Sequence, residues 1–317
     1  MLEPAAPRSV AADDPLAGVA ALPGVADAVD VARRACEELR WHEAYRRRWR
    51  EVRAEAGIRS ARASAALDGA RVPVDVVRAL ALGAGAAGGT GAGAAGGTGA
   101  AARRTGAGAV GADRAGPDMD VVVGALRAAV EIERHMPDLG ARGTPGLPPL
   151  GQLVARVHAA AGSGWLPDDA LGRLRTDAAP QDLYGLGPAP DGADLAGRLD
   201  LLARVLGRTH APALVVAAVV HGELLTLRPF AAGNGVVARG LARLVLTVRG
   251  LDPTGSVVPE AAWAEAPNAY LGSAAGFATG TPGGVGAWVR ACAEAVVVGV
   301  DAARDVADAV VSGRLTR

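Results

Sequence analysis

The sequence predicts an all-α fold with one small β-hairpin, and two observations support that prediction. Apolar residues recur at helical spacing along most of the chain, whereas strand signals are scarce and turn residues gather in residues 165–192. Half of the 317 residues are hydrophobic but only 3% are aromatic, so alanine, valine and leucine must fill the core. A chain of this length forms one large domain or two small ones.

Glycine and proline residues divide the helical pattern, because both tend to end helices. Gly57 is expected to end a long polar helix, and Pro73 is expected to open a short one. In chain order the expected helices cover 25–57, 59–68, 73–83, 118–136, 147–160, 191–209, 211–227, 235–249, 261–278 and 283–308. Residues 165–192 contain the turn signals and are expected to form the hairpin.

A tract rich in glycine and alanine interrupts the helices. The octapeptide GAGAAGGT occurs at 83–90 and again, unchanged, at 91–98, and such glycine density is expected to behave as flexible coil. The tract also contains G-x-G-x-x-G, but no strand precedes it and any such repeat generates the pattern, so it does not indicate a dinucleotide site. The chain therefore divides into an N-terminal helical region at 1–82, a flexible insertion at 83–116 and a main domain at 117–310.

The charged residues exclude several classes of protein. Lys+Arg and Asp+Glu are both 33, and the resulting net charge of zero argues against a nucleic-acid-binding protein, whose affinity would need a basic surface. The sequence contains no lysine, so its 33 cationic side chains are all arginine. A Walker A loop and a Schiff-base enzyme each require a lysine amine, and the sequence excludes both.

The sequence is expected to belong to a cytoplasmic protein that does not enter a membrane. Cys36 and Cys292 are the only cysteines, and two isolated thiols suit a reducing compartment. The N-terminal residues lack the basic and apolar segments of a signal peptide. The longest uncharged apolar run, at 213–220, is shorter than the roughly 20 residues that a spanning helix needs.

The stretch LRPFAAGNGVVAR, residues 227–239, joins two apolar helices. Pro229 ends the first helix, and the Gly-Asn-Gly turn at 233–235 lets the backbone turn tightly. A glycine-rich turn that leads into a helix presents unpaired N–H groups at the positive end of the helix dipole. We call the turn at 233–235 the anion cradle. Arg239 follows one turn into the helix, where a guanidinium can clamp a phosphate oxygen.

This stretch resembles the signature of the Fic (Fido-fold) family, H-P-F-x-(D/E)-G-N-G-R-x-x-R. The resemblance covers about 117–300, includes GRLR at 172–175 in place of the family's G-x-Y-R, and implies a mainly helical Fido fold. It implies AMP transfer from ATP to a hydroxyl of a target protein, which docks on the hairpin formed by 165–192, here called the flap segment. The residues it identifies as nucleotide- or phosphate-binding are Phe230, Gly233, Asn234, Gly235 and Arg239.

Three positions depart from the signature. Arg228 stands at the position of the catalytic histidine, Ala232 at that of the acidic magnesium ligand, and Val236 at that of the first arginine. An arginine stays protonated and cannot act as a general base, whose loss typically removes about 10²–10⁴ in rate. The sequence therefore predicts no catalytic residue and no metal ligand, but a pocket for ATP or another nucleotide in which catalysis is lost or strongly altered and Mg²⁺ is not bound by the usual residue.

Arg228 has two interpretations. It is either an added cation that faces phosphate in place of magnesium, or a solvent-facing side chain that fills vacated space. Two other functions also stay open for the whole chain: a protein-interaction module that uses the flap segment, and a transferase with a different phosphorylated donor.

A second family motif precedes the main domain. Fic proteins with an N-terminal inhibitory helix carry (S/T)-x-x-x-E-(G/N), and SAALDG places Ser64, Asp68 and Gly69 on this motif. The resemblance implies that Asp68 pairs with Arg239 and blocks productive ATP binding. The alternative is that Asp68 only caps the end of its own helix.

Three further groups of residues have a structural and a functional interpretation. His221 is either a hydrogen-bonded core histidine or a ligand, and Glu223 is either a surface residue or a substitute base. The arginine run at 46–48 with Trp49 belongs either to an ion-paired helix face or to a nucleic-acid site. The structural interpretation is favoured for each. His158 and His210 lack a partner at metal-ligand spacing.

Overall fold

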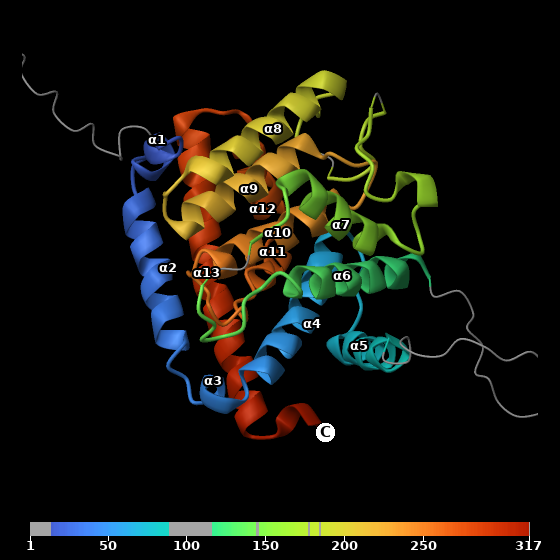
Figure 1. Ribbon diagram of the computed structural model, residues 1–317, viewed down its shortest axis with the longest axis vertical. Coiled ribbons are helices and arrows are strands. Elements are labelled where there is room, and N and C mark those ends of the chain that lie inside the picture. Colours follow the sequence, from blue (N-terminus) through green and yellow to red (C-terminus); the bar gives the residue numbers. More distant parts are fainter. Residues whose placement is uncertain (1–13, 89–115, 144–145, 177, 184, 317) are drawn as a thin grey trace, which may run out of the picture.

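The structure is a computed structural model that describes residues 14–88, 116–143, 146–176, 178–183 and 185–316. Within these ranges the regular structure is helical and contains no strand, which confirms the predicted all-α fold (Figure 1). The N-terminal helices are α1 (Ala17–Ala20), α2 (Val25–Leu39), α3 (Ala44–Arg47), α4 (Trp49–Leu67) and α5 (Val74–Gly88). The others are α6 (Pro117–Glu133), α7 (Leu150–Gly162), α8 (Gly192–Arg208), α9 (Ala213–Leu227), α10 (Asn234–Val248), α11 (Glu260–Glu265), α12 (Pro267–Ala278) and α13 (Pro282–Val311).

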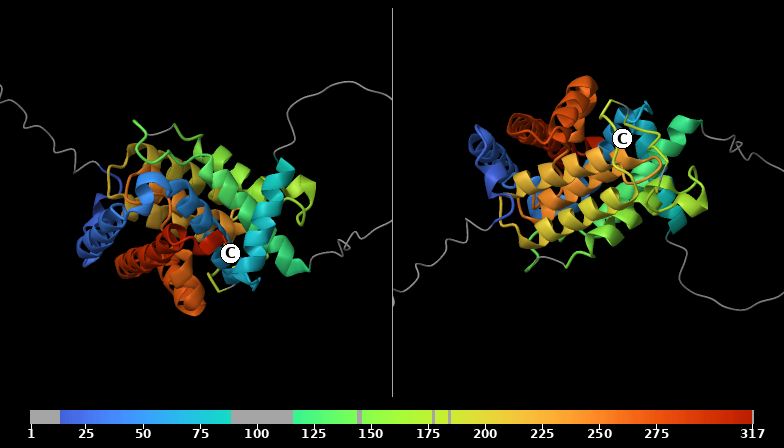
Figure 2. Two further views of the ribbon diagram at one scale, coloured as in Figure 1. Left: turned by 90° about the horizontal axis from the view of Figure 1, so that it is seen from below. Right: turned by 90° about the horizontal axis from the view of Figure 1, so that it is seen from above.

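Helices α9 and α10 form the centre of the bundle. Both are buried on nearly every side, because α8, α12 and α13 pack against α9 while α4, α6 and α7 pack against α10. A helix that is apolar all round needs such neighbours, and this explains the almost uninterrupted apolar sequence of α9. Figure 2 shows from two directions that α2 lies beside α13 at the edge of the bundle. The stretch 227–239 therefore connects the two most buried helices.

The prediction of one continuous helix over 25–57 is wrong, because the chain turns between Leu39 and Trp49. At the turn, Nδ1 of His42 accepts a hydrogen bond from the N–H of Ala44 at 3.2 Å, which gives that N–H a partner outside a helix. The turn allows α2 to pack on α13 while α4 packs on α6 and α11. The predicted helix 59–68 is the second half of α4.

Gly57 does not end a helix, since α4 continues through it to Leu67. A Cβ atom on Gly57 would lie 4.0 Å from Nη1 of Arg243, so α4 approaches α10 at this point. Packing of α4 against α6, α10 and α11 outweighs the roughly 1 kcal/mol that glycine costs inside a helix. The predicted helix 261–278 is also divided, because Pro267 opens α12 and excludes the helical conformation for the residue before it.

The N-terminal end of the predicted insertion, Gly83 to Gly88, belongs to α5. Residues 89–115, which contain most of the predicted insertion, lie outside the described residues. The long helix α13 is the one helix in the described ranges that could cross a membrane by length and composition alone. Half of its most apolar window is buried within the protein, as in the core helix of a folded domain.

The flap segment differs from the predicted hairpin. Its described residues contain a 3-10 turn at Asp168–Ala170 and otherwise irregular backbone, without a strand. The N–H groups of Arg175 and Gln181 donate to the carbonyls of Pro229 at 2.9 Å and Ala231 at 2.7 Å. The flap segment thus bonds to the stretch 227–239, and the N–H of Gly192 also donates to the carbonyl of Thr176 at 3.1 Å. No strand ladder forms among its described residues, and its prolines have no N–H to contribute to one.

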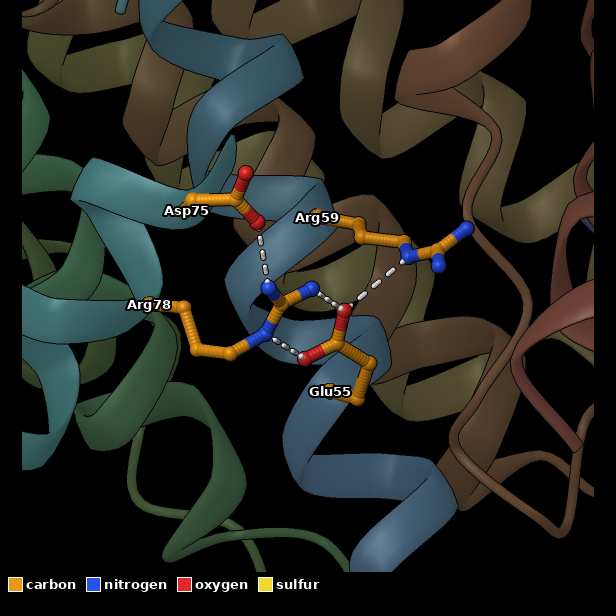
Figure 3. A network of polar contacts seen from close by, with 4 residues as sticks. All are labelled: Glu55, Arg59, Asp75 and Arg78. Carbon is orange, nitrogen blue, oxygen red and sulfur yellow. Dashed lines mark hydrogen bonds and ion pairs between the residues drawn. The ribbon is translucent and has the colours of Figure 1, made fainter. Parts of the chain in front are cut away.

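A charged network fixes α5 against α4 (Figure 3). The Glu55 carboxylate, only 5% exposed, accepts two hydrogen bonds from Arg78 at 2.6 and 3.0 Å and one from Arg59 at 3.2 Å. Asp75 pairs with the other side of Arg78 at 2.7 Å but is 84% exposed. The two-pronged contact of Arg78 with a buried carboxylate is the stronger geometry. It helps to hold α4, which carries Ser64 and Asp68, in place.

Replacing Glu55 with glutamine is expected to lower the free energy of unfolding by about 1–2 kcal/mol, because the amide keeps the size but loses the charge that Arg78 and Arg59 share. Chemical denaturation measures this change. The matched control is Asp75→Asn, with an expected change of less than about 0.5 kcal/mol because that carboxylate is solvated. Equal losses in the two variants would contradict a special role for the buried contact.

Candidate functional site

The loop before α10 is closed by the side chain of Asn234. Its Oδ1 accepts a hydrogen bond from the N–H of Phe230, and its Nδ2 donates to the carbonyl of Phe230, both at 2.9 Å. Gly233 takes φ +79° at the N-cap of α10, a conformation that favours glycine. Phe230 is fully buried and its ring stacks on His158 at a centroid distance of 3.7 Å. Phe230 and Asn234 therefore shape the anion cradle instead of facing an open cavity.

His158 supports the same loop. Its Nδ1 accepts a hydrogen bond from the N–H of Gly172 at 2.9 Å, so Nε2 carries the proton and donates to the carbonyl of Ala232 at 3.0 Å. Burial lowers the pKa of His158, and the bond to Ala232 offsets this only in part. With both ring nitrogens engaged in hydrogen bonds, His158 positions the loop.

Arg239 is bound to the end of α4, where the second motif placed its partner. Its Nη2 pairs with Oδ2 of Asp68 at 2.7 Å and donates to the carbonyl of Ser64 at 3.0 Å, while Nε donates to Oγ of Ser64 at 2.7 Å. The Arg239 side chain is 0% exposed and that of Asp68 is 17% exposed. Burial alone lowers the pKa of Arg239, but Asp68 and Tyr270 raise it further than burial lowers it. Gly69 takes φ +100° just after α4 and allows the chain to turn away.

Several hydrogen-bond donors at the anion cradle have no partner in the described part of the chain. They are the N–H groups of Gly235 and Val236 and the Nη1 atom of Arg239. A Cβ atom on Gly235 would lie 2.6 Å from Oδ1 of Asp68 and 2.8 Å from Nη1 of Arg239, so only glycine fits beside this ion pair. Unpaired N–H groups at a helix N-terminus next to a guanidinium are the chemistry that binds phosphate.

Arg228 is not solvent-facing, and that interpretation is wrong. Its side chain is buried, with Nη2 donating to the carbonyl of Gly187 at 2.6 Å and Nη1 to that of Leu183 at 3.3 Å. Burial lowers its pKa, and Asp182 partly offsets the change. The residue takes φ +41° at the C-cap of α9. The guanidinium thus fastens the flap segment to the stretch 227–239.

Two residues of the site, Asp182 and Arg175, have no role assigned to them by the sequence patterns alone. Asp182 of the flap segment accepts hydrogen bonds from the N–H of Asn234 at 2.8 Å and from its Nδ2 at 2.7 Å. Burial raises the pKa of Asp182, while the bonds from Asn234 act in the opposite direction. Arg175 donates from Nε to the carbonyl of Arg228 at 2.7 Å and from Nη2 to that of Leu227 at 3.0 Å. The arginine of GRLR at 172–175 signalled Arg175, whereas no sequence pattern links Asp182 to Asn234.

The other candidate residues have structural roles. Nε2 of His221 lies 2.8 Å from the hydroxyl of Tyr270 in an aromatic core, and Glu223 pairs with Arg198 at 2.8 Å. Val236 lines a small cavity of about 20 Å³ formed mainly by α4, α6 and α10. Ala232 offers no ligand atom, and no cluster of three or more His, Cys, Asp or Glu side chains suits a metal ion in the described ranges. In the run at 46–48, Arg48 pairs with Glu51.

The overall arrangement of the helices resembles that of solved structures. A crystal structure of a Fic family protein from Desulfovibrio desulfuricans G20 superposes with a TM-score of 0.61 over 89% of this chain and 74% of that one, at 18% identity. The chain has a Fic fold. Fic-1 from C. elegans matches with a TM-score of 0.55 at 16% identity, over 89% of this chain and 72% of that one. No protein-family model and no curated protein matches the sequence.

Proposed function

We propose that this Fic-fold protein binds a nucleotide or another phosphorylated ligand at the anion cradle, and that α4 restrains this binding. The observation that supports the proposal is the contact of Arg239 with Asp68 and Ser64. A buried guanidinium beside unpaired helix N–H groups suits an anion, and a carboxylate from α4 already neutralises it. A ligand phosphate has to replace that carboxylate, so α4 acts as an inhibitory helix.

We further propose that AMP transfer is lost or strongly reduced. Arg228 replaces the histidine that the family uses as base, and its guanidinium is engaged by the carbonyls of Leu183 and Gly187. Ala232 cannot supply the carboxylate that would hold Mg²⁺. The residues that agree with the family signature suit ligand binding better than catalysis, since they provide hydrogen-bond donors and a cation but no general base and no metal ligand.

Calorimetric titration with ATP, ADP and pyrophosphate, with and without Mg²⁺, tests the proposal on the wild type and on Asp68→Ala. We expect Asp68→Ala to bind at least about tenfold more tightly, which corresponds to about 1.4 kcal/mol. Asp75→Ala, which removes an exposed carboxylate, is the control and leaves the affinity unchanged. If neither the wild type nor Asp68→Ala binds any of the three ligands, the proposal is wrong.

A second candidate function is a protein-interaction module, and the exposure of Leu174 favours it. Leu174 stands at the tyrosine position of the segment that resembles G-x-Y-R, and it is 43% exposed. Arg175, its buried neighbour, holds the flap segment to α9, so the exposed side chain is presented on a fixed backbone. If no nucleotide binds, affinity capture with the wild type and with Leu174→Asp tests this function. We expect the wild type to capture a partner protein and Leu174→Asp to capture less of it.

A further inference from the structure

The anion cradle already contains an anion supplied by the protein. Both oxygens of Asp182 accept hydrogen bonds from Asn234, and one of these comes from the first N–H of α10. That N–H lies at the positive end of the helix, where a phosphate oxygen would accept a bond. The carboxylate is partly buried and comes from the flap segment, which Arg228 and Arg175 fasten to the end of α9.

The charges of the site show that a bound phosphate and this carboxylate oppose one another. Asp68 and Asp182 both face the cradle, and each repels the other, since Asp68 raises the pKa of Asp182 while Arg239 lowers it. A phosphate that binds beside both carboxylates would be repelled by two negative charges. It would also compete with Asp182 for the N–H of Asn234. Nη1 of Arg239 is buried beside Gly235 without a hydrogen-bond partner, and the N–H groups of Gly235 and Val236 also have none among the described residues.

We propose that Asp182 is a second internal inhibitor, which occupies the anion cradle from the flap side as Asp68 occupies Arg239 from the α4 side. The proposal rests on the function proposed above. A phosphorylated ligand therefore binds in full only when both carboxylates are displaced. When Asp182 is displaced, the flap segment loses its hydrogen bonds to Asn234. Ligand binding at the anion cradle is therefore coupled to the position of the flap segment.

The test titrates pyrophosphate, first without and then with Mg²⁺, into four full-length proteins: the wild type, Asp68→Ala, Asp182→Ala and the double variant. We expect Asp182→Ala to raise the affinity about tenfold in the Asp68→Ala background, the size expected from losing one charge-assisted contact. Asp182→Asn keeps the shape of the side chain and is expected to raise the affinity less. Asp169→Ala removes an exposed carboxylate of the same segment and is the control, with no change expected. In the wild type, the NMR signal of the Asn234 backbone amide is expected to shift when pyrophosphate is added.

The outcomes separate this inference from the proposed function. If Asp68→Ala binds pyrophosphate and replacement of Asp182 does not change that affinity, the inference is overturned while the proposed function stands. If none of the four proteins binds, both are wrong. A loss of affinity in Asp182→Ala that occurs only with Mg²⁺ present would identify Asp182 as a metal ligand and would also overturn the inference.

Discussion

Replacing Asp68 with alanine is expected to lower the free energy of unfolding by about 3 kcal/mol, because it leaves the Arg239 guanidinium buried without a counter-charge. The Arg239 side chain is 0% exposed, and without Asp68 its polar neighbours are the neutral oxygens of Ser64 and the hydroxyl of Tyr270. A phosphate ligand restores the missing charge, so saturating pyrophosphate should recover most of this loss through binding to the folded state. Denaturant titration with and without pyrophosphate measures both effects.

The control for this prediction is Asp75→Ala, which makes the same chemical change at a carboxylate that is 84% exposed. Its expected loss is below about 0.5 kcal/mol, and pyrophosphate should not alter it. An Asp68→Ala protein as stable as the wild type would show that Arg239 reaches another partner on its own. If Asp68→Ala is destabilised and pyrophosphate does not restore its stability, the ion pair stabilises the fold but Arg239 does not bind the anion.

The sequence predicted the fold class and most helices correctly, and the errors have physical causes. The apolar runs of α9 and α10 identify buried helices because burial on all sides requires apolar residues on all sides. The sequence wrongly predicts a helix end at Gly57, since helix propensity describes an isolated helix and omits the packing of α4 against α6 and α10. The turn between Leu39 and Trp49 depends on the contact of α2 with α13, which is far away in the sequence.

The site was predictable only where a short pattern carries it. The contact between Asp68 and Arg239 was predictable because two short motifs that resemble a family's keep their residues at fixed spacing in the sequence. Asp182 could not be predicted, since it lies 52 residues from Asn234 and the irregular backbone of the flap segment brings them together. The contacts of Arg228 with the carbonyls of the flap segment could not be predicted either. Every residue has a backbone carbonyl, so a contact with one produces no sequence pattern.

Replacing Arg175 with alanine is expected to be the most destabilising change, with a loss of about 3–5 kcal/mol in the free energy of unfolding. The last carbonyls of a helix lack partners within it, and Arg175 supplies them for Leu227 and Arg228 at the buried end of α9. Its Nη2 also donates to the carbonyl of Pro190. Alanine would leave the carbonyls of Leu227 and Arg228 buried and unpaired at about 1–3 kcal/mol each.

Hydrogen exchange distinguishes this effect from a general loss of stability. In Arg175→Ala the N–H of Gln181, which donates to Ala231, should exchange faster than in the wild type, while amides in the middle of α13 follow only the global change. Arg173→Ala removes an exposed arginine from the same segment and is expected to leave both unchanged. Equal protection of Gln181 in Arg175→Ala and the wild type would mean that the other contacts of the flap segment, from Arg228 and Asp182, hold it without the Arg175 side chain.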